Sequence, residues 1–298
     1  MLNHKLILSV LFFSALNPLA ISAEASTSTE LPFELLIADI DTCEIVKYGR
    51  DGKPVWTYGG VKPLDIWPLK GDEAVMAYLP SKLTKNKGGI RIVNAKKEIV
   101  FDHPLQEEVM SCQPLPDGTI LFTENKAGKL TELTREGKTL RSFDVKAKGM
   151  GHKTVRFIRL TPQDTILAAE CYSHLLREYK RDGTFLREFK LTMAFCGSRL
   201  GNGHTLLSAY RPGRVIEFDE KGNSVWELAA TELPKSCGIS IFGEAQRLPN
   251  GNTLISGYGG SGKNRVSTVL AITLDKKVVW QLKDPARKKI LSVKPLPK

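Results

Sequence analysis

Two short turn phrases alternate along the chain, and their regular spacing restricts the fold more than any other feature. The first is a turn that follows Leu or Pro and precedes an apolar run, with copies centred on Gly71, Gly118, Gly203 and Gly251 and a degenerate copy at Asp164. The second is a polar turn followed by an apolar or aromatic run, and its copies begin at positions 51, 96, 136, 182, 221 and 275. Both phrases recur at intervals of roughly 45 residues, which is typical of repeat architectures.

Each repeat therefore contains two predicted β-hairpins. Asp-Gly and Asn-Gly between apolar runs form hairpin turns, because Gly accepts the positive φ that these turns require. Two hairpins give four strands per repeat, and four-stranded units at this period are propeller blades. The chain is thus predicted to be an all-β, six-bladed β-propeller with four-stranded blades, formed by a single domain over residues 34–298.

The two ends of the repeat region are incomplete in complementary ways. The N-terminal end supplies only three strands, near residues 35–39, 44–48 and 55–58, whereas Ile290–Leu296 supplies one strand of the innermost type. Together they complete one blade, which leaves no open sheet edge in the ring. We therefore predict that the C-terminal strand closes the ring by joining the N-terminal blade, and a flat β-solenoid explains the two ends less well.

The first 25 residues have the pattern of a secretory signal peptide. Lys5 precedes an apolar run over residues 6–16, Asn17 and Pro18 interrupt it, and small residues follow up to Ala25. Such a run is too short to span a bilayer, although a membrane anchor is the alternative interpretation. Residues 26–33 form a polar lead-in. The mature protein is expected to be periplasmic or secreted, without a membrane span.

The charge balance indicates the kind of partner. The chain has 43 Lys and Arg against 32 Asp and Glu, a net charge of +11, which favours an anionic small molecule or glycan, or a protein partner. Nucleic acid is disfavoured, because export removes the usual targets and the lysines are dispersed rather than clustered. No spacing typical of a metal site is present, and no metal or cofactor is expected.

Three segments resemble repeats of a known superfamily. They are Gly213–Phe218 leading to Trp226, Leu248–Leu254, and Asn264–Val266 leading to Trp280. These segments resemble the repeats of bacterial arylsulfotransferase-type and quinoprotein-like (PQQ-like) β-propellers, and the resemblance covers residues 34–298 as a repeat style. It implies an exported enzyme that carries a sulfuryl group on a histidine. Quinoproteins usually have eight blades, so no quinone is expected here.

Function is expected on the face opposite the tight turns, because variable loops on a rigid scaffold usually carry the site. Arg156, Arg199 and Arg247 begin or line inner strands and are predicted to form a basic ring at the channel mouth that binds carboxylate, sulfate or phosphate. Salt bridges between blades are the alternative. His152 lies four residues before Arg156 and is the candidate catalytic residue; an isolated surface histidine is the alternative.

Further candidates end the second strands of their blades. Glu124 and Glu170 hold equivalent places on neighbouring blades and are predicted to act as paired carboxylates, unless they are solvated rim charges. Tyr210 and Tyr258 are predicted to stack on a ligand ring, or else to cover the blade ends. These four residues complete the ligand-binding set.

Among the 5 cysteines, one pair is suited to a disulfide. Cys196 and Cys237 precede or open the inner strands of adjacent blades, and an oxidising compartment favours their bridging. The sequence thus predicts an exported propeller that binds a ligand or a protein partner on its variable-loop face. The alternative is an enzyme at the channel mouth, performing arylsulfotransferase-like sulfuryl transfer or polysaccharide cleavage.

Overall fold

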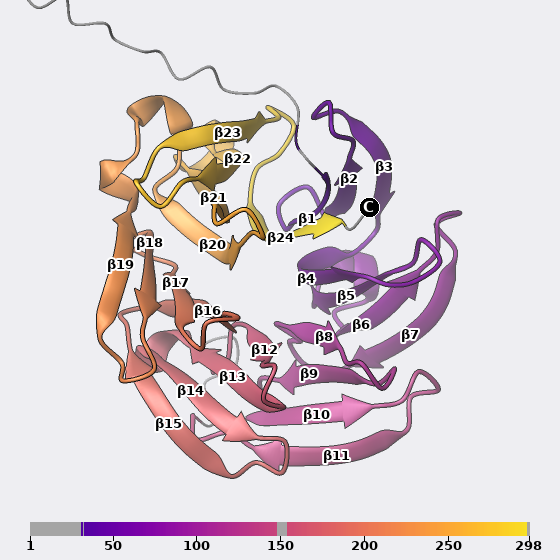
Figure 1. Cartoon of the computed structure of the whole chain (residues 1–298). Coiled ribbons are helices and arrows are strands. Elements are labelled where there is room, and N and C mark those ends of the chain that lie inside the picture. The colour runs from indigo at the N-terminus through magenta and orange to yellow at the C-terminus, as the bar shows by residue number, and fades with distance from the viewer. Residues whose placement is uncertain (1–30, 32, 148–153, 297–298) are drawn as a thin grey trace, which may run out of the picture.

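The computed structural model describes residues 31, 33–147 and 154–296, and its strands form a ring of blades. Six antiparallel sheets of four strands each surround a central axis (Figure 1). Helical structure in the described residues is limited to short 3-10 turns. The prediction of an all-β, six-bladed propeller with four-stranded blades is confirmed.

The blades are numbered here in chain order, and their strands are given from the axis outward. Blade 1 contains β24 (Ile290–Leu296), β1 (Glu34–Asp39), β2 (Glu44–Tyr48) and β3 (Pro54–Gly59). Blade 2 contains β4 (Lys62–Pro68), β5 (Ala74–Leu79), β6 (Gly88–Val93) and β7 (Ile99–Leu105). Blade 3 contains β8 (Cys112–Pro114), β9 (Ile120–Glu124), β10 (Lys129–Leu133) and β11 (Thr139–Asp144).

The remaining blades follow the same order. Blade 4 contains β12 (Ile158–Leu160), β13 (Thr165–Glu170), β14 (Leu175–Lys180) and β15 (Phe185–Lys190). Blade 5 contains β16 (Ala194–Arg199), β17 (Thr205–Ala209), β18 (Arg214–Phe218) and β19 (Ser224–Ala229). Blade 6 contains β20 (Ile241–Arg247), β21 (Thr253–Gly259), β22 (Val266–Ile272) and β23 (Val278–Lys283).

Ring closure follows the predicted arrangement. β24 pairs with β1 in antiparallel register, from Glu34 opposite Leu296 to Asp39 opposite Ile290. In Figure 1 the yellow C-terminal strand lies beside the indigo N-terminal strands. An apolar cluster that includes Leu31 and Trp280 then packs blade 6 against blade 1. The ends of the described chain are thus joined within one blade, so the ring has no unpaired inner edge.

The tight turns explain why the repeats form hairpins. In the turn of blade 3, Gly118 has φ 87° and its amide donates to the carbonyl of Leu115 at 3.0 Å. In blade 6, Gly251 has φ 85° and donates to Leu248 at 2.9 Å. The same turn geometry therefore recurs where the same phrase recurs, because only glycine adopts this conformation without a steric penalty.

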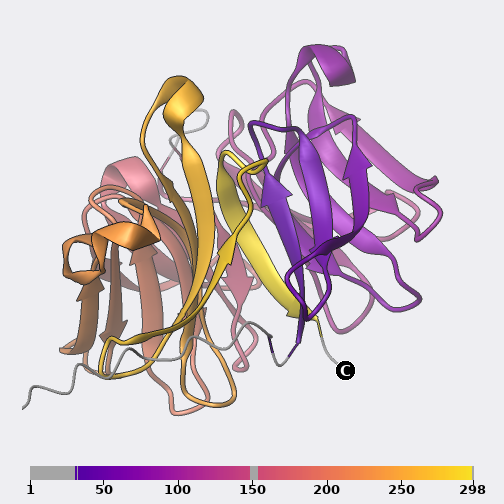
Figure 2. The same cartoon turned by 90° about the horizontal axis from the view of Figure 1, so that it is seen from above.

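The two faces of the ring differ in the length of their loops. The tight-turn face carries the connections from first to second and from third to fourth strands. The opposite face, here called the variable-loop face, carries the longer connections and the 3-10 turns η1 (Lys82–Thr84), η3 (Cys171–Ser173), η4 (Ala230–Glu232), η5 (Lys235–Cys237) and η6 (Gly262–Asn264). Figure 2 shows that the η1 and η6 loops project from this face. No helix of the described residues has the length and apolar character needed to cross a membrane.

Candidate functional site

Chain direction decides which side chains reach the channel mouth. Every inner strand runs from the variable-loop face toward the tight-turn face, so residues just before an inner strand lie at the mouth. Arg156 precedes β12 and Lys289 precedes β24. Both therefore lie on the variable-loop face, next to the axis.

Arg199 and Arg247 lie at the opposite end of the ring, which corrects the prediction of a three-arginine ring. They are the last residues of β16 and β20, so they reach the tight-turn face. Arg199 forms an ion pair with Glu178 of the preceding blade at 2.5 Å. Arg247 pairs with Glu217 in the same way, also at 2.5 Å, and its guanidinium lies 4.9 Å from the centroid of the Trp226 ring. These two arginines therefore form salt bridges between blades.

Four aromatic side chains from three adjacent blades pack together beneath the mouth. The Phe157 ring lies 4.9 Å from the Phe195 ring, and Phe195 stacks on Tyr210 at 5.2 Å. The hydroxyls of Tyr210 and Tyr258 then meet at 2.5 Å. The two tyrosines named from the sequence are thus brought together, and Tyr258 is buried while Tyr210 is partly exposed.

Two cations lie over Tyr258. The Arg265 guanidinium is 5.0 Å from the centroid of its ring, and Nζ of Lys289 is 5.6 Å from it. The electron-rich face of a tyrosine attracts such cations. Arg265 also forms an ion pair with Asp41. We call Arg156, Tyr210, Tyr258, Arg265 and Lys289 the mouth cluster.

Lys289 is held in place by its backbone. Asp39, which is fully buried at the end of β1, accepts hydrogen bonds from the amides of Lys288 at 2.7 Å and Lys289 at 3.0 Å. The amide of Ile40 donates in turn to the carbonyl of Lys289 at 3.1 Å. These hydrogen bonds therefore fix the backbone from which the half-buried Lys289 side chain extends.

Burial and neighbouring charges act on the Lys289 ammonium. Desolvation lowers its pKa, the carboxylate of Asp41 opposes that effect, and the cations Arg265, Arg156 and Lys62 lower the pKa further. Burial is thus the main cause of the lowered pKa, and the three cations add to it against Asp41. An anion entering the mouth would interact favourably with these cations.

Arg156 has unused hydrogen-bonding capacity. Its side chain lies against the thiol of Cys171, and its charge opposes the increase in the pKa of that thiol caused by burial. Its Nε is buried and has no hydrogen-bond partner among the described residues. A buried donor without a partner is costly, which makes Arg156 suited to an acceptor supplied by a ligand.

An apolar layer forms the floor of the mouth. It is a single cluster contributed by all six blades and comprises Ile40, Leu64, Met110, Phe157, Phe195, Cys196, Ile241, Tyr258 and Leu291, with Leu79 and Tyr210 packed against it. These side chains close the axis beneath the cations. A ligand at the mouth therefore rests on an apolar and aromatic surface.

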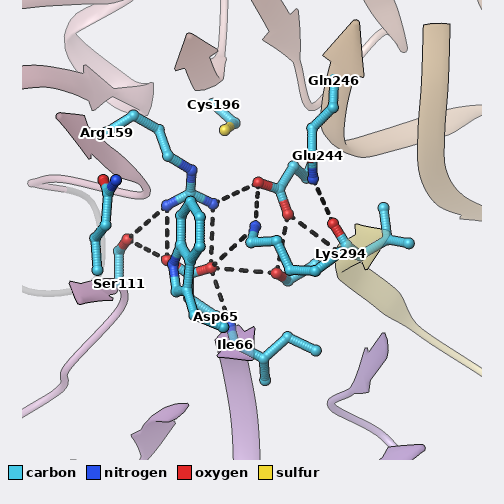
Figure 3. A network of polar contacts seen from close by, with 12 residues as sticks. Asp65, Ile66, Ser111, Arg159, Cys196, Glu244, Gln246 and Lys294 are labelled. Atoms are coloured by element: carbon cyan, nitrogen blue, oxygen red, sulfur yellow. Dashed lines mark hydrogen bonds and ion pairs between the residues drawn. The ribbon is translucent and has the colours of Figure 1, made fainter. Parts of the chain in front are cut away.

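Below this floor the axis contains a buried network of charges (Figure 3). Arg159 bridges Asp65 and Glu244, with contacts of 2.8 Å and 2.6 Å. Lys294 forms an ion pair with Glu244 and lies 3.8 Å from Asp65. Ser111 donates to Asp65 at 2.5 Å. Two acids and two bases thus balance each other, and this network joins blades rather than facing solvent.

The two predicted carboxylates do not form a pair. Glu124 accepts a hydrogen bond from Thr131 of its own blade. Glu170 is fully buried, forms an ion pair with Arg177 and accepts from the hydroxyl of Tyr179 at 3.2 Å, again within its own blade. Each acid is therefore neutralised or satisfied locally, which corrects the prediction of shared acid–base chemistry.

The predicted disulfide is absent. Cys196 and Cys237 are both free thiols, as are Cys43, Cys112 and Cys171. Cys196 packs in the apolar floor at the axis, whereas Cys237 packs in a separate cluster between blades 5 and 6. Because the two sulfurs belong to different layers of packing, the prediction from adjacent blades was wrong.

His152, the candidate catalytic residue, lies outside the described residues. Within the described residues, no group of three or more His, Cys, Asp or Glu is arranged to hold a metal ion. Sequence reasoning missed Arg265, Lys289 and the whole axial network. A signal existed for Lys289 only, since it directly precedes the strand that closes the ring.

Comparison with known proteins supports the architecture. The structure resembles that of a Bacteroides caccae protein of unknown function, with a TM-score of 0.76 and 20% identity over 90% of this chain and 100% of that chain. A structure described as a nidogen/laminin complex matches with a TM-score of 0.62 and 12% identity, over 87% and 97% of the two chains. A streptogramin B lyase matches with a TM-score of 0.59 and 14% identity, over 83% and 78%.

These similarities are too low in identity to transfer an activity. No family model matches the chain, and no curated protein matches it. The neighbours share the β-propeller fold, and they do not show the arylsulfotransferase-like or quinoprotein-like relationship that the repeats suggested. The chain is a six-bladed β-propeller whose functional hypothesis rests on its own mouth cluster.

Proposed function

We propose that this propeller binds an anionic ligand at the mouth cluster on its variable-loop face. The observation that supports it most is the excess of positive charge around Lys289, which Arg265, Arg156 and Lys62 surround with Asp41 as the opposing acid. Cations concentrated over an apolar floor attract an anion, and the low dielectric of the floor strengthens that attraction.

The charge distribution of the whole chain agrees with this site. Lysine and arginine outnumber aspartate and glutamate in the sequence of the variable-face loops, whereas the tight-turn loops carry both signs in near balance. The net charge of +11 therefore belongs mainly to the variable-loop face. Such a field raises the local concentration of anions and their rate of association.

The geometry also restricts the shape of the ligand. Arg156 provides a buried Nε without a partner in the described part of the chain, and Arg265 and Lys289 lie together over one ring. A carboxylate, sulfate or phosphate group fits these donors, since guanidinium groups bind such anions through two parallel hydrogen bonds. Tyr210, which is partly exposed and stacks on the buried Phe195, favours a ligand that also carries a sugar or aromatic ring.

A thermal-shift and calorimetric comparison tests the proposal. Glucuronate, phosphate and an aryl sulfate are compared with neutral glucose at low salt. We expect the anions to stabilise the native protein and glucose to leave it unchanged. Each charge-assisted hydrogen bond contributes about 1.5–3 kcal/mol, so Arg265→Gln should weaken anion binding by about tenfold or more.

A matched variant separates site binding from general salt effects. Lys53 lies on the tight-turn face and is exposed, so Lys53→Gln removes one positive charge far from the mouth. Anions such as sulfate stabilise most proteins because they are excluded from the protein surface, and this effect is the same in every variant. If Arg265→Gln and Lys53→Gln respond to anions as the native protein does, the mouth is not the binding site.

We further propose that the protein is exported, on the basis of the apolar run over residues 6–16 and the small residues that follow. Cell fractionation and N-terminal sequencing of the mature chain test this. We expect a mature N-terminus near residue 24 or 26, because cleavage follows small residues. A cytoplasmic protein that retains its first residues would overturn it.

A further inference from the structure

The η1 loop on blade 2 carries an exposed leucine that the fold does not use. Its 3-10 turn, Lys82–Thr84, lies between β5 and β6 and projects from the variable-loop face (Figure 2). Leu83 in this turn is 58% exposed, and it belongs to none of the apolar clusters that the described residues form. Its apolar surface therefore remains in water unless a partner covers it.

Contacts at its base hold this loop in a defined shape. The amide of Asn86 donates to the carbonyl of Ser81 at 2.7 Å, which closes the loop. Lys85 has a φ of 51°, in the left-handed region that residues other than glycine seldom adopt. Gly88 packs so closely that a Cβ there would lie 2.1 Å from the carbonyl oxygen of Glu107. The loop is thus anchored, and its leucine is held away from the blade.

Uncompensated positive charge surrounds this leucine. Lys82 and Lys85 are exposed, and Lys87 is partly exposed. Among the residues that the structure describes, none of the three lysines forms an ion pair. Residues 74–97 contain no Asp or Glu, so the loop and both of its strands supply no carboxylate. An exposed apolar tip among unpaired lysines is suited to an anionic surface with an apolar interior.

A second loop on the same face has the same character. η6 lies on blade 6, between β21 and β22, and its Lys263 is exposed. Lys263 makes no ion pair with any described residue, and Val266, which follows the loop, is 47% exposed. Blades 2 and 6 are the two neighbours of blade 1, so the loops stand on either side of it and project in the same direction (Figure 1 and Figure 2). A flat surface can therefore touch both loops at once.

We propose that the η1 and η6 loops dock the protein on the surface of an anionic lipid bilayer. Leu83 inserts at the boundary between headgroups and acyl chains, and the lysines of both loops contact the lipid phosphates. The negative potential of such a surface attracts nearby lysines, and an inserted apolar side chain adds the gain of burial. A soluble polyanion would attract the lysines equally but would give Leu83 no apolar surroundings, which favours the bilayer. The inference goes beyond the proposed function, because it uses no residue of the mouth cluster.

Cosedimentation with lipid vesicles tests the docking. The full chain is mixed with vesicles of phosphatidylcholine alone or of equimolar phosphatidylcholine and phosphatidylglycerol. We expect tighter binding to the anionic vesicles, and weaker binding at high salt, which screens the lysines. Leu83→Ser should weaken binding about fivefold, because it removes the inserted apolar surface. The triple variant Lys82→Gln, Lys85→Gln, Lys87→Gln should weaken binding about hundredfold, since each lysine near an anionic surface contributes about fivefold.

Matched variants on the tight-turn face control for general effects. Leu274 lies in the turn between β22 and β23 and is 56% exposed, so Leu274→Ser removes a leucine of similar exposure. Lys53→Gln, Lys96→Gln and Lys221→Gln together remove the same number of exposed charges from that face. Both controls should bind vesicles as the native protein does. Residues 6–16 are unchanged in every variant, so any binding through this apolar run adds equally to all of them.

Hydrogen exchange locates the contact in the native protein, without a variant. Vesicles should slow the exchange of the amides in residues 81–87 and leave the turn at 94–98, on the opposite face of blade 2, unchanged. An equal effect on both segments, or equal weakening by Leu83→Ser and Leu274→Ser, would overturn the docking. Loss of binding in the triple lysine variant with full binding by Leu83→Ser would also overturn it and point to a soluble polyanion.

The outcomes are separable from those for the mouth cluster. Leu83→Ser should keep the thermal stabilisation by phosphate, because it changes no charge and no residue of that cluster. If anionic vesicles do not bind the native protein, the docking is wrong, and the anion site at the mouth still stands or falls by its own ligand comparison. Absence of any anion effect with retained vesicle binding would contradict the proposed function and support the docking.

Discussion

Arg159, on the inner strand of blade 4, donates a 2.8 Å hydrogen bond across the axis to Asp65, on the inner strand of blade 2. Its second terminal nitrogen donates to Glu244 of blade 6 at 2.6 Å. One guanidinium thus joins three blades that are not neighbours in sequence. Lys294 completes the set from the C-terminal strand. Because all four charges are buried, the network is balanced only while every member is present.

Removal of the central cation should destabilise the ring strongly. Arg159→Met keeps most of the side-chain volume but leaves two buried acids facing Lys294 alone. We expect a loss of about 3–5 kcal/mol in the free energy of unfolding, measured by urea titration. Arg135→Met is the matched control, because its 2.7 Å pair with Glu73 is exposed and should contribute less than about 1 kcal/mol. Equal losses in both variants would contradict a structural role for the network.

The network should also make stability depend on pH below neutrality. Burial raises the pKa of Glu244, but the Arg159 and Lys294 charges outweigh it and lower the pKa to about 2. A carboxylate with a depressed folded pKa stabilises the protein above its unfolded pKa of about 4.5 and loses that contribution as the pH falls toward 2. Burial, together with the Arg159 charge, lowers the pKa of Lys294.

Urea midpoints between pH 7 and pH 3 measure this dependence. We expect the native protein to lose stability steeply below about pH 4.5 and Glu244→Gln to show a flatter profile from a lower starting value. Glu73→Gln, which alters a partly exposed acid on the tight-turn face, is the comparison. A profile of Glu244→Gln that runs parallel to that of the native protein would argue against the lowered pKa.

The fold was predictable because local chemistry repeats along the chain. Each Gly-containing turn requires a positive φ and forms a hairpin, as at Gly118 and Gly251. This requirement can be recognised in the sequence without knowledge of the tertiary contacts. The composite blade followed from two incomplete ends. A register shift between third and fourth strands recurs in every blade, and no residue pattern indicates it.

The site was less predictable because it depends on contacts between distant residues. Arg156, Arg199 and Arg247 look alike in the sequence, since each lies next to an inner strand. One precedes its strand and the other two end theirs, which places them on opposite faces. Lys289 is positioned by Asp39, which lies 250 residues away, and no local pattern encodes such a contact.

Ring closure can be tested by truncation. Deletion of 290–298 removes β24 together with Ser292 and Lys294, which exposes the edge of β1 and unbalances the axial charges. We expect aggregation or a large loss of thermal stability, because an unpaired strand edge recruits other chains. Deletion of 297–298 alone spares β24 and is the control. A soluble monomer with native stability after the longer deletion would refute closure by this strand.

Arg156 and Arg247 should separate binding from stability when each is changed to alanine. Arg247→Ala breaks the 2.5 Å pair with Glu217 and uncovers Trp226, so we expect a loss of about 2 kcal/mol in unfolding free energy and unchanged anion affinity. Arg156→Ala removes a mouth donor whose Nε has no partner within residues 33–147 and 154–296, so stability should change little while anion affinity falls about tenfold. Urea titration and calorimetry with glucuronate measure the two effects on the same protein preparations. If Arg247→Ala weakens anion binding as much as Arg156→Ala does, the loss of affinity reflects the net charge of the protein rather than a contact at the mouth. The assignment of the two arginines to separate roles would then be wrong.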